Sequence, residues 1–167
     1  VSGDALARLS DARPVRLRAS VLTSGSLTDA GIGDRAGRRA YEMAGVGPDD
    51  IDVAEVHDAT AFGELAQTER LGFCAVGDGG PYAASGATSL GGARPINTSG
   101  GLECRGHPIG ATGLAQVTEI VTQLRGEAGN RQVEGAGIGL TENGGGFIGM
   151  GEAAVAVHIL ERVNGLA

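Results

Sequence analysis

A glycine-rich segment at residues 97–113 is the feature that most restricts how this chain can fold. It reads Asn-Thr-Ser-Gly-Gly-Leu-Glu-Cys-Arg-Gly-His-Pro-Ile-Gly-Ala-Thr-Gly. Glycine allows the backbone to turn tightly, and Pro108 is suited to the first turn of a helix. We therefore expect His107 to be fixed in a turn just before a helix, where its imidazole can face a reacting group. From these residues alone, a packing turn with a surface histidine is an equally good interpretation.

Short runs of apolar residues elsewhere in the chain predict β-strands. At residues 15–21, apolar side chains alternate with Arg and Ser, a pattern typical of a strand with one covered face. The run at residues 153–160 is apolar at nearly every position, so we expect a strand that is buried on both faces. Two shorter strands are expected at residues 51–56 and 136–140.

Helices are expected between these strands. Asp34 is a candidate N-cap for a first helix, whose apolar side includes Met43. A second helix is expected shortly after residue 58, with Phe62 among its apolar positions. The clearest helical pattern includes Leu114 on its apolar face and ends at Gly126.

The connections between these elements are expected to hold the functional residues. Residues 77–92 have no sustained periodicity and predict a long ordered loop, whereas residues 143–146 predict a tight turn. The strand at residues 51–56 stops at His57 and Asp58. In α/β sheets, ligands usually bind beyond the carboxyl ends of strands, so His57 is a candidate site residue.

Composition excludes several classes of function. The 167 residues suffice for one core of ordinary domain size or for half of a larger enzyme. A net charge of −7 disfavours binding to a nucleic-acid backbone. All basic side chains are Arg, and without a Lys the chain can form neither a Schiff base nor a P-loop. We expect no membrane span, because no run approaches the roughly 20 apolar residues that one requires.

Several motifs resemble those of thiolases. The segment at residues 97–113 is similar to the thiolase motif around Gly-His-Pro, residues 50–55 are similar to the approach to the second motif, and the penultimate hairpin is similar to the third. The resemblance covers most of the chain and matches roughly the C-terminal two-fifths of a full-length thiolase. It implies an α/β thiolase-fold half-domain with a mixed sheet of about five strands and helices on its faces. Residues 1–167 would then be the C-terminal domain, and the half that carries the nucleophile would lie outside this chain.

The resemblance also assigns roles to the two histidines. In thiolases, the histidine of Gly-His-Pro activates a cysteine nucleophile, so His107 inherits that role. The second motif contains His57 and Asp58 and is similar to that of the sterol-carrier and lipid-transfer branch, in which the histidine helps to shape the oxyanion site. Ala59 stands where several members of that branch carry an acid/base cysteine. Three further motif residues are expected to contact substrate: Ser99, Gly106 and Asp58.

The third motif departs from that of ordinary thiolases, which is Cys-x-Gly-Gly-Gly. Here Glu142 and Asn143 precede the glycines, and both are candidate catalytic residues. Glu142 can act as a base if burial raises its pKa, although a solvated loop carboxylate is an equal alternative. The backbone amides at Gly144 and Gly145 are candidate oxyanion donors.

The implied function is a thiolase-type acyl-CoA acyltransferase that makes or breaks a carbon–carbon bond. Because Ala59 and Glu142 occupy both usual positions of the second cysteine, two alternatives stay open. One is a thiolase-like retro-aldolase acting on a steroid or aromatic acyl-CoA. The other is a non-catalytic subunit that binds acyl-CoA or stabilises a partner.

The resemblance also implies the ligands and partners. Coenzyme A thioester is expected as substrate, with no permanently bound cofactor and no metal. The expected partners are the N-terminal half, from the same gene or a separate chain, further copies in a homo- or hetero-oligomer such as a dimer, and a small zinc-ribbon and OB-fold protein. We expect the chain alone to expose an apolar face that such a partner covers.

The cysteines and the last histidine allow other interpretations. Two cysteines, Cys74 and Cys104, are too few for a disulfide framework, which favours a cytoplasmic location. Cys104 and His107 have a C-x-x-H spacing, so a zinc site completed by Cys74 and His57 and a reactive thiol at Cys104 are both minor alternatives. His158 is expected to be a core or edge histidine.

Overall fold

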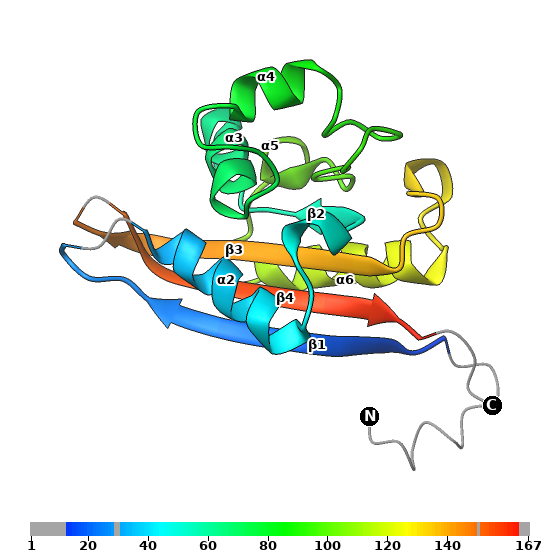
Figure 1. Cartoon of the computed structure of the whole chain (residues 1–167), viewed down its shortest axis with the longest axis horizontal. Coiled ribbons are helices and arrows are strands. Elements are labelled where there is room, and N and C mark those ends of the chain that lie inside the picture. Colours follow the sequence, from blue (N-terminus) through cyan, green and yellow to red (C-terminus); the bar gives the residue numbers. More distant parts are fainter. Residues whose placement is uncertain (1–12, 29–30, 150, 164–167) are drawn as a thin grey trace, which may run out of the picture.

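Four strands form one mixed sheet in the order β1-β4-β3-β2 in this computed structural model (Figure 1). The structure describes residues 13–28, 31–149 and 151–163. The strand bounds are Val15–Ser24 for β1, Val53–Glu55 for β2, Ile138–Ile148 for β3 and Gly151–Arg162 for β4. β4 pairs antiparallel with both β1 and β3, and β2 pairs parallel to β3.

The sheet has one strand fewer than predicted in the described residues, because the fifth position holds only a single bridge. Ile96 forms an isolated parallel bridge with Ala54, beyond β2. Pro95 has no N–H to donate, and Asn97 has a φ of 53°, which ends the extended conformation. The chain therefore touches the sheet edge at one residue and then enters the glycine-rich segment.

Helices cover both faces of the sheet. Their bounds are Ile32–Ala44 for α2, Ala61–Arg70 for α3, Gly79–Ala84 for α4, Gly101–Arg105 for α5 and Thr112–Arg125 for α6, with short 3-10 turns at Pro48–Asp50 and Gly129–Arg131. Helix α2 packs on β1 and β4, and α6 packs on the opposite face, mainly against β3 and β2. Helices α3, α4 and α5 gather at the β2 side of the sheet (Figure 1). No helix in the described ranges is long and apolar enough to cross a membrane.

The prediction of a tight turn at residues 143–146 was wrong. β3 continues through these residues, with Asn143 opposite Ala156 and Gly144 opposite Val155 in the ladder. The chain reverses only after β3 ends at Ile148. Glycines are a turn signal in sequence, but here they leave a strand without side chains beside the candidate site.

Burial along the two long strands also differs from prediction. The register of β1 shifts between Leu17 and Ala19, so this β-bulge leaves Leu17 57% exposed while Ala19 is buried. β4 was predicted to be buried on both faces. Instead Val155 and Val157 are buried on the α2 side, whereas Ala156 between them is partly exposed. The reason is that α6 makes most of its sheet contacts with β3 and β2, and few with β4 and β1.

Helix ends account for the remaining differences. Helix α2 begins at Ile32, so Asp34 lies in its first turn rather than at its N-cap. Helix α6 begins at Thr112 rather than at Pro108. The predicted loop at residues 77–92 contains the short helix α4. Three residues expected on apolar helix faces are exposed instead: Met43, Phe62 and Leu114.

Candidate active site

Two histidines from distant parts of the sequence meet beside the sheet. His57 follows the end of β2, and His107 lies in the turn between α5 and α6. Their ring centroids are 5.0 Å apart, and the rings stand edge to face at 86°. This is the arrangement in which two imidazoles can act on one bound group.

Buried polar contacts fix the backbone that carries His57. The amide of Val56 donates to Oδ1 of Asn97 at 2.9 Å, which ties the end of β2 to the start of the glycine-rich segment. The amide of His57 donates to Oε2 of Glu142 at 3.0 Å. Asn97 and Glu142 thus fix the backbone at Val56 and His57.

Asp58 joins the His57 segment to the bend that carries His107. Asp58 is 3% exposed, and its carboxylate accepts hydrogen bonds from the amides of Leu102, at 2.7 Å, and Glu103, at 3.4 Å. Helix α5 approaches so closely that a Cβ on Gly101 would lie 1.9 Å from Oδ2 of Asp58. Gly101 also has a φ of 61°, a conformation that favours glycine. The described contacts of Asp58 are thus to the protein backbone, whereas the sequence suggested contact with substrate.

Ser99 fixes the same bend through two hydrogen bonds to Glu55. Its hydroxyl donates to Oε2 of Glu55 at 2.6 Å, and its amide donates to Oε1 at 3.0 Å. Arg105 forms an ion pair with Glu55 at 3.5 Å. Burial raises the pKa of Glu55 to about 7, against the lowering effect of its hydrogen bonds with Ser99. Gly106 ends α5 with a φ of 85° and is exposed beside His107.

Thr112 sets the proton position of His107. Nδ1 of His107 lies 2.7 Å from Oγ1 of Thr112, whose hydroxyl donates to the carbonyl oxygen of Pro108 at 3.3 Å. A hydroxyl has a single hydrogen, so Thr112 accepts from an Nδ1–H of His107. The lone pair is then on Nε2 of His107, a residue that is exposed in this chain.

His57 is hydrogen-bonded in a different way. Nδ2 of Asn143 lies 3.2 Å from Nδ1 of His57 and also donates to Oε1 of Gln116 at 3.1 Å. Burial, reinforced by the nearby His107, lowers the pKa of His57. His57 is therefore neutral at pH 7.

Glu142 is a buried acid rather than a solvated loop carboxylate. It is 0% exposed on β3, and burial raises its pKa to about 8. Oε2 accepts from the amide of His57, while Oε1 has no hydrogen-bond partner within the described chain. At neutral pH the side chain is mainly protonated, so it is better suited to donating a proton than to accepting one.

A pocket of about 270 Å³ opens next to His57. Gly144 and Gly145 form one wall and α3 another. Glu152 also lines the pocket and accepts hydrogen bonds at 2.9 Å from both Gln67 and Arg70 of α3. Sequence reasoning missed these three residues and also the buried Gln116, because a single buried polar residue in a helix or strand has no motif to mark it.

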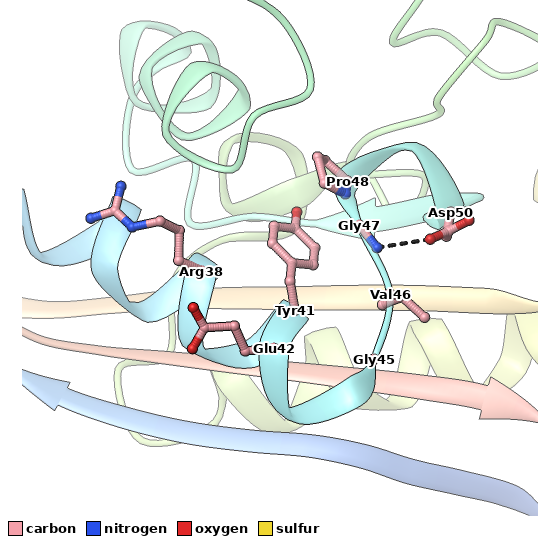
Figure 2. A pocket seen from close by; sticks show the side chains of 8 residues that line it. All are labelled: Arg38, Tyr41, Glu42, Gly45, Val46, Gly47, Pro48 and Asp50. Carbon is pink, nitrogen blue, oxygen red and sulfur yellow. Dashed lines mark hydrogen bonds between the residues drawn. The ribbon is translucent and has the colours of Figure 1, made fainter.

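A second pocket, at the C-terminal end of α2, contains none of the predicted site residues (Figure 2). Tyr41 points across it toward Pro48, and the amide of Gly47 donates to Oδ2 of Asp50 at 2.7 Å. The hydroxyl of Tyr41 is already bound to the carbonyl oxygen of Leu71 at 2.8 Å. These contacts close the turn after α2 and present no reactive group.

The remaining candidates lie outside this arrangement. Cys104 is exposed on α5 and Cys74 is partly buried. No group of three or more His, Cys, Asp or Glu side chains within residues 13–28, 31–149 and 151–163 is placed to hold a metal ion. His158 is half-buried in β4, as expected of a core or edge histidine, and burial lowers its pKa.

The mixed sheet, the glycine-rich bend and the paired histidines define a thiolase-type domain, and the chain belongs to the thiolase family: residues 18–162 match the family described as thiolase C-terminal domain-like. An acetyl-CoA acetyltransferase from Methanothermobacter thermautotrophicus is 46% identical over 159 residues, which cover 89% of this chain and 40% of that protein. Sterol carrier protein 2 from Rattus norvegicus is 51% identical over 120 residues, which cover 72% of this chain and 21% of that protein.

A solved structure also matches the fold. The structure titled "Ltp2-ChsH2(DUF35) aldolase" has a TM-score of 0.79 and 25% sequence identity, and the match covers 96% of this chain and 42% of that one. The chain thus spans less than half the length of each of these relatives. The α/β fold and the family predicted from the sequence are confirmed.

Proposed function

We propose that this chain is one half of an acyl-CoA enzyme and that it supplies two histidines to the making or breaking of a carbon–carbon bond, as in thiolase-type acyltransferases. The observation that carries the proposal is the contact between His57 and His107, whose ring centroids are 5.0 Å apart. The likeness to proteins named acetyl-CoA acetyltransferase supports this class of reaction. The nucleophile would come from an N-terminal half, in the same polypeptide or in a separate one.

His107 is the proposed base. With its proton on Nδ1 and Thr112 holding that side of the ring, Nε2 can accept the proton of a cysteine thiol from the other half. The resulting thiolate then attacks the thioester carbonyl of the substrate. The exposure of His107 in this chain supports the idea that a residue from outside completes the site.

His57 and the backbone amide of Gly144 are the proposed donors to the thioester oxygen. Negative charge develops on this oxygen when the thiolate adds, and a positioned N–H stabilises it. Both residues line the pocket of about 270 Å³, which offers space for the acyl group. Removing one such donor typically costs about 100-fold or more in rate.

Covalent trapping tests this proposal in the complete enzyme. Incubation with a radiolabelled acyl-CoA should label one cysteine, and His107→Ala should slow the labelling by about 100-fold or more. His158→Ala is the matched control, because His158 is a partly buried histidine within β4 and lies outside the proposed site. If no cysteine of the unaltered enzyme becomes labelled, the acyltransferase proposal fails. Unchanged turnover after His107→Ala would instead favour a non-catalytic role for this chain.

A retro-aldolase is the second candidate, and the residues at the thiolase cysteine positions favour it. Ala59 and Glu142 replace those cysteines, and burial raises the pKa of Glu142 to about 8. The likeness to a structure titled as an aldolase supports this candidate as well. In a retro-aldol cleavage, a base removes the proton of a β-hydroxyl group, and the Cα–Cβ bond breaks to give a carbonyl product. The other fragment leaves as the enolate of the acyl-CoA, which takes up a proton.

The two candidates differ in their products. Thiolysis consumes one free thiol of coenzyme A for each bond broken, whereas aldol cleavage releases an aldehyde or ketone and consumes none. Assaying free thiol and carbonyl product together, with β-keto and β-hydroxy acyl-CoA substrates, therefore decides between them. Carbonyl release at constant thiol would select the aldolase.

A further inference from the structure

We propose that Gln116 is a positioning residue which, through Asn143, holds His57 in the tautomer whose ring proton is on Nε2. This inference builds on the proposed function, because it explains how His57 comes to present a hydrogen-bond donor to a substrate oxygen. Gln116 lies outside the sequence motifs, whereas Asn143 was predicted from the sequence to be a catalytic residue. Three hydrogen bonds carry the proposal, and each one fixes the orientation of the next group.

The first contact is made to a backbone carbonyl oxygen, whose role in hydrogen bonding is fixed. Gln116 is 0% exposed on α6, and its Nε2 donates to the backbone carbonyl oxygen of Glu142 at 2.9 Å. A carbonyl oxygen can only accept a hydrogen bond. The side-chain amide of Gln116 is therefore held in one orientation, with its nitrogen toward β3 and its oxygen toward Asn143.

Asn143 takes its orientation from Gln116. Its Nδ2 donates to Oε1 of Gln116 at 3.1 Å and lies 3.2 Å from Nδ1 of His57. An amide nitrogen carries two hydrogens and cannot accept. One hydrogen goes to Gln116 and the other to His57, so Nδ1 of His57 must be an acceptor without a proton.

The proton of the neutral His57 ring is then on Nε2. Burial keeps this ring neutral by lowering its pKa, so Nε2–H is its single donor. His107 has the opposite arrangement, with its proton on Nδ1, where it contacts Thr112. Although the two rings are neighbours, one thus offers a donor and the other a lone pair. Both hydrogens of the Asn143 amide are used within the protein, so Nδ2 is assigned to positioning His57 and not to donating to the substrate.

The decisive variant is Asn143→Asp, which keeps the shape of the side chain but replaces the donor by an acceptor. An ionised carboxylate beside Nδ1 requires a proton there, so His57 should change to the Nδ1–H tautomer or become doubly protonated. Gln116→Met removes the anchor without changing Asn143 and should give a mixture of tautomers. Gln123→Met is the matched control, because Gln123 is a second buried glutamine on α6 and its side chain contacts neither Asn143 nor His57.

The tautomer is read directly from the ring carbon and nitrogen shifts of isotope-labelled histidine. The chain is prepared together with the nucleophile-bearing half, and the His57 signals are identified by their loss in His57→Gln. We expect the Nε2–H form in the unaltered protein and in Gln123→Met, and its loss in Asn143→Asp. If Asn143→Asp does not fold, the mixture expected for Gln116→Met decides. An Nδ1–H form in the unaltered protein, or unchanged shifts in Gln116→Met and Asn143→Asp, would overturn the proposal.

Activity provides a second readout that a purely structural role would not produce. Asn143→Asp should lower kcat by about 100-fold and Gln116→Met by about tenfold, with little change in KM, because the donor acts mainly in the transition state. Gln123→Met should leave kcat unchanged. The tautomer measurement does not depend on turnover, so failure of the proposed function and failure of this inference are distinguishable.

Discussion

Replacing Gly101 with alanine should separate the glycine-rich bend at residues 97–113 from the carboxylate of Asp58, which fixes it. An added Cβ would lie 1.9 Å from Oδ2 of Asp58, so the carboxylate must move away from the amide of Leu102, which it holds at 2.7 Å. Losing a hydrogen bond to a charged group typically costs about 1.5–3 kcal/mol. The left-handed conformation at Gly101, with a φ of 61°, adds about 1–2 kcal/mol for any other residue. We therefore expect Gly101→Ala to lower the free energy of unfolding by about 2.5–5 kcal/mol.

Gly126→Ala is the control for this prediction. Gly126 has a φ of 72°, but nothing lies within 4 Å of the position of its added Cβ. It should therefore show the conformational penalty alone, about 1–2 kcal/mol. Urea unfolding of both variants measures the difference between them. Equal losses of stability in Gly101→Ala and Gly126→Ala would refute the claim that Asp58 fixes the bend by close contact.

Two further predictions concern protonation. Burial raises the pKa of Glu142 to about 8, so between pH 5 and 8 the folded chain binds one proton more than the unfolded chain, and stability falls as pH rises. Glu142→Gln should make the free energy of unfolding fall less steeply with pH, by up to about 1.4 kcal/mol per pH unit. An unchanged dependence of this free energy on pH, measured by urea unfolding, would contradict the raised pKa of Glu142. Thr112→Val removes the acceptor for Nδ1 of His107 and should lower kcat about tenfold by loosening the base. Thr118→Val, an exposed threonine on the same helix, should leave kcat unchanged, and equal kcat values for the two variants would refute this role of Thr112.

The sequence predicted the parts of the fold that follow from local patterns. The alternation at residues 15–21 and the run at residues 153–160 became β1 and β4, and the pattern that includes Leu114 became α6. Exposure could not be predicted in the same way. The bulge that turns Leu17 outward depends on the register with β4, which is a long-range property.

Glycine residues led to a wrong prediction at residues 143–146 and to a correct one at residues 97–113. At residues 143–146 glycines indicated a turn, but the strand pairing with β4 overrode this local signal. At residues 97–113 glycines do form a close bend, because Gly101 lies against Asp58. The same residue type thus marks a turn or a close approach, and only the tertiary neighbours decide which.

The candidate site was predictable as far as the motifs reach. The resemblance to thiolases assigned active-site roles to His57 and His107, and the two rings meet in the structure. The contacts that orient them were not predictable, because Gln116 is one of several polar residues on α6 and no sequence pattern distinguishes the buried ones. Burial of Glu142 was likewise undecided, since its position within β3 depends on the strand that replaced the predicted turn.

A double-mutant cycle on the two histidines tests the central claim most directly. In the complete enzyme, His57→Ala, His107→Ala and the double variant are compared by kcat/KM for cleavage of the carbon–carbon bond in an acyl-CoA. If both rings act on one thioester, each single variant should lose about 100-fold or more, and the double variant should lose far less than the product of the two. Independent, multiplying losses, or a single variant with full activity, would contradict a site built from this pair.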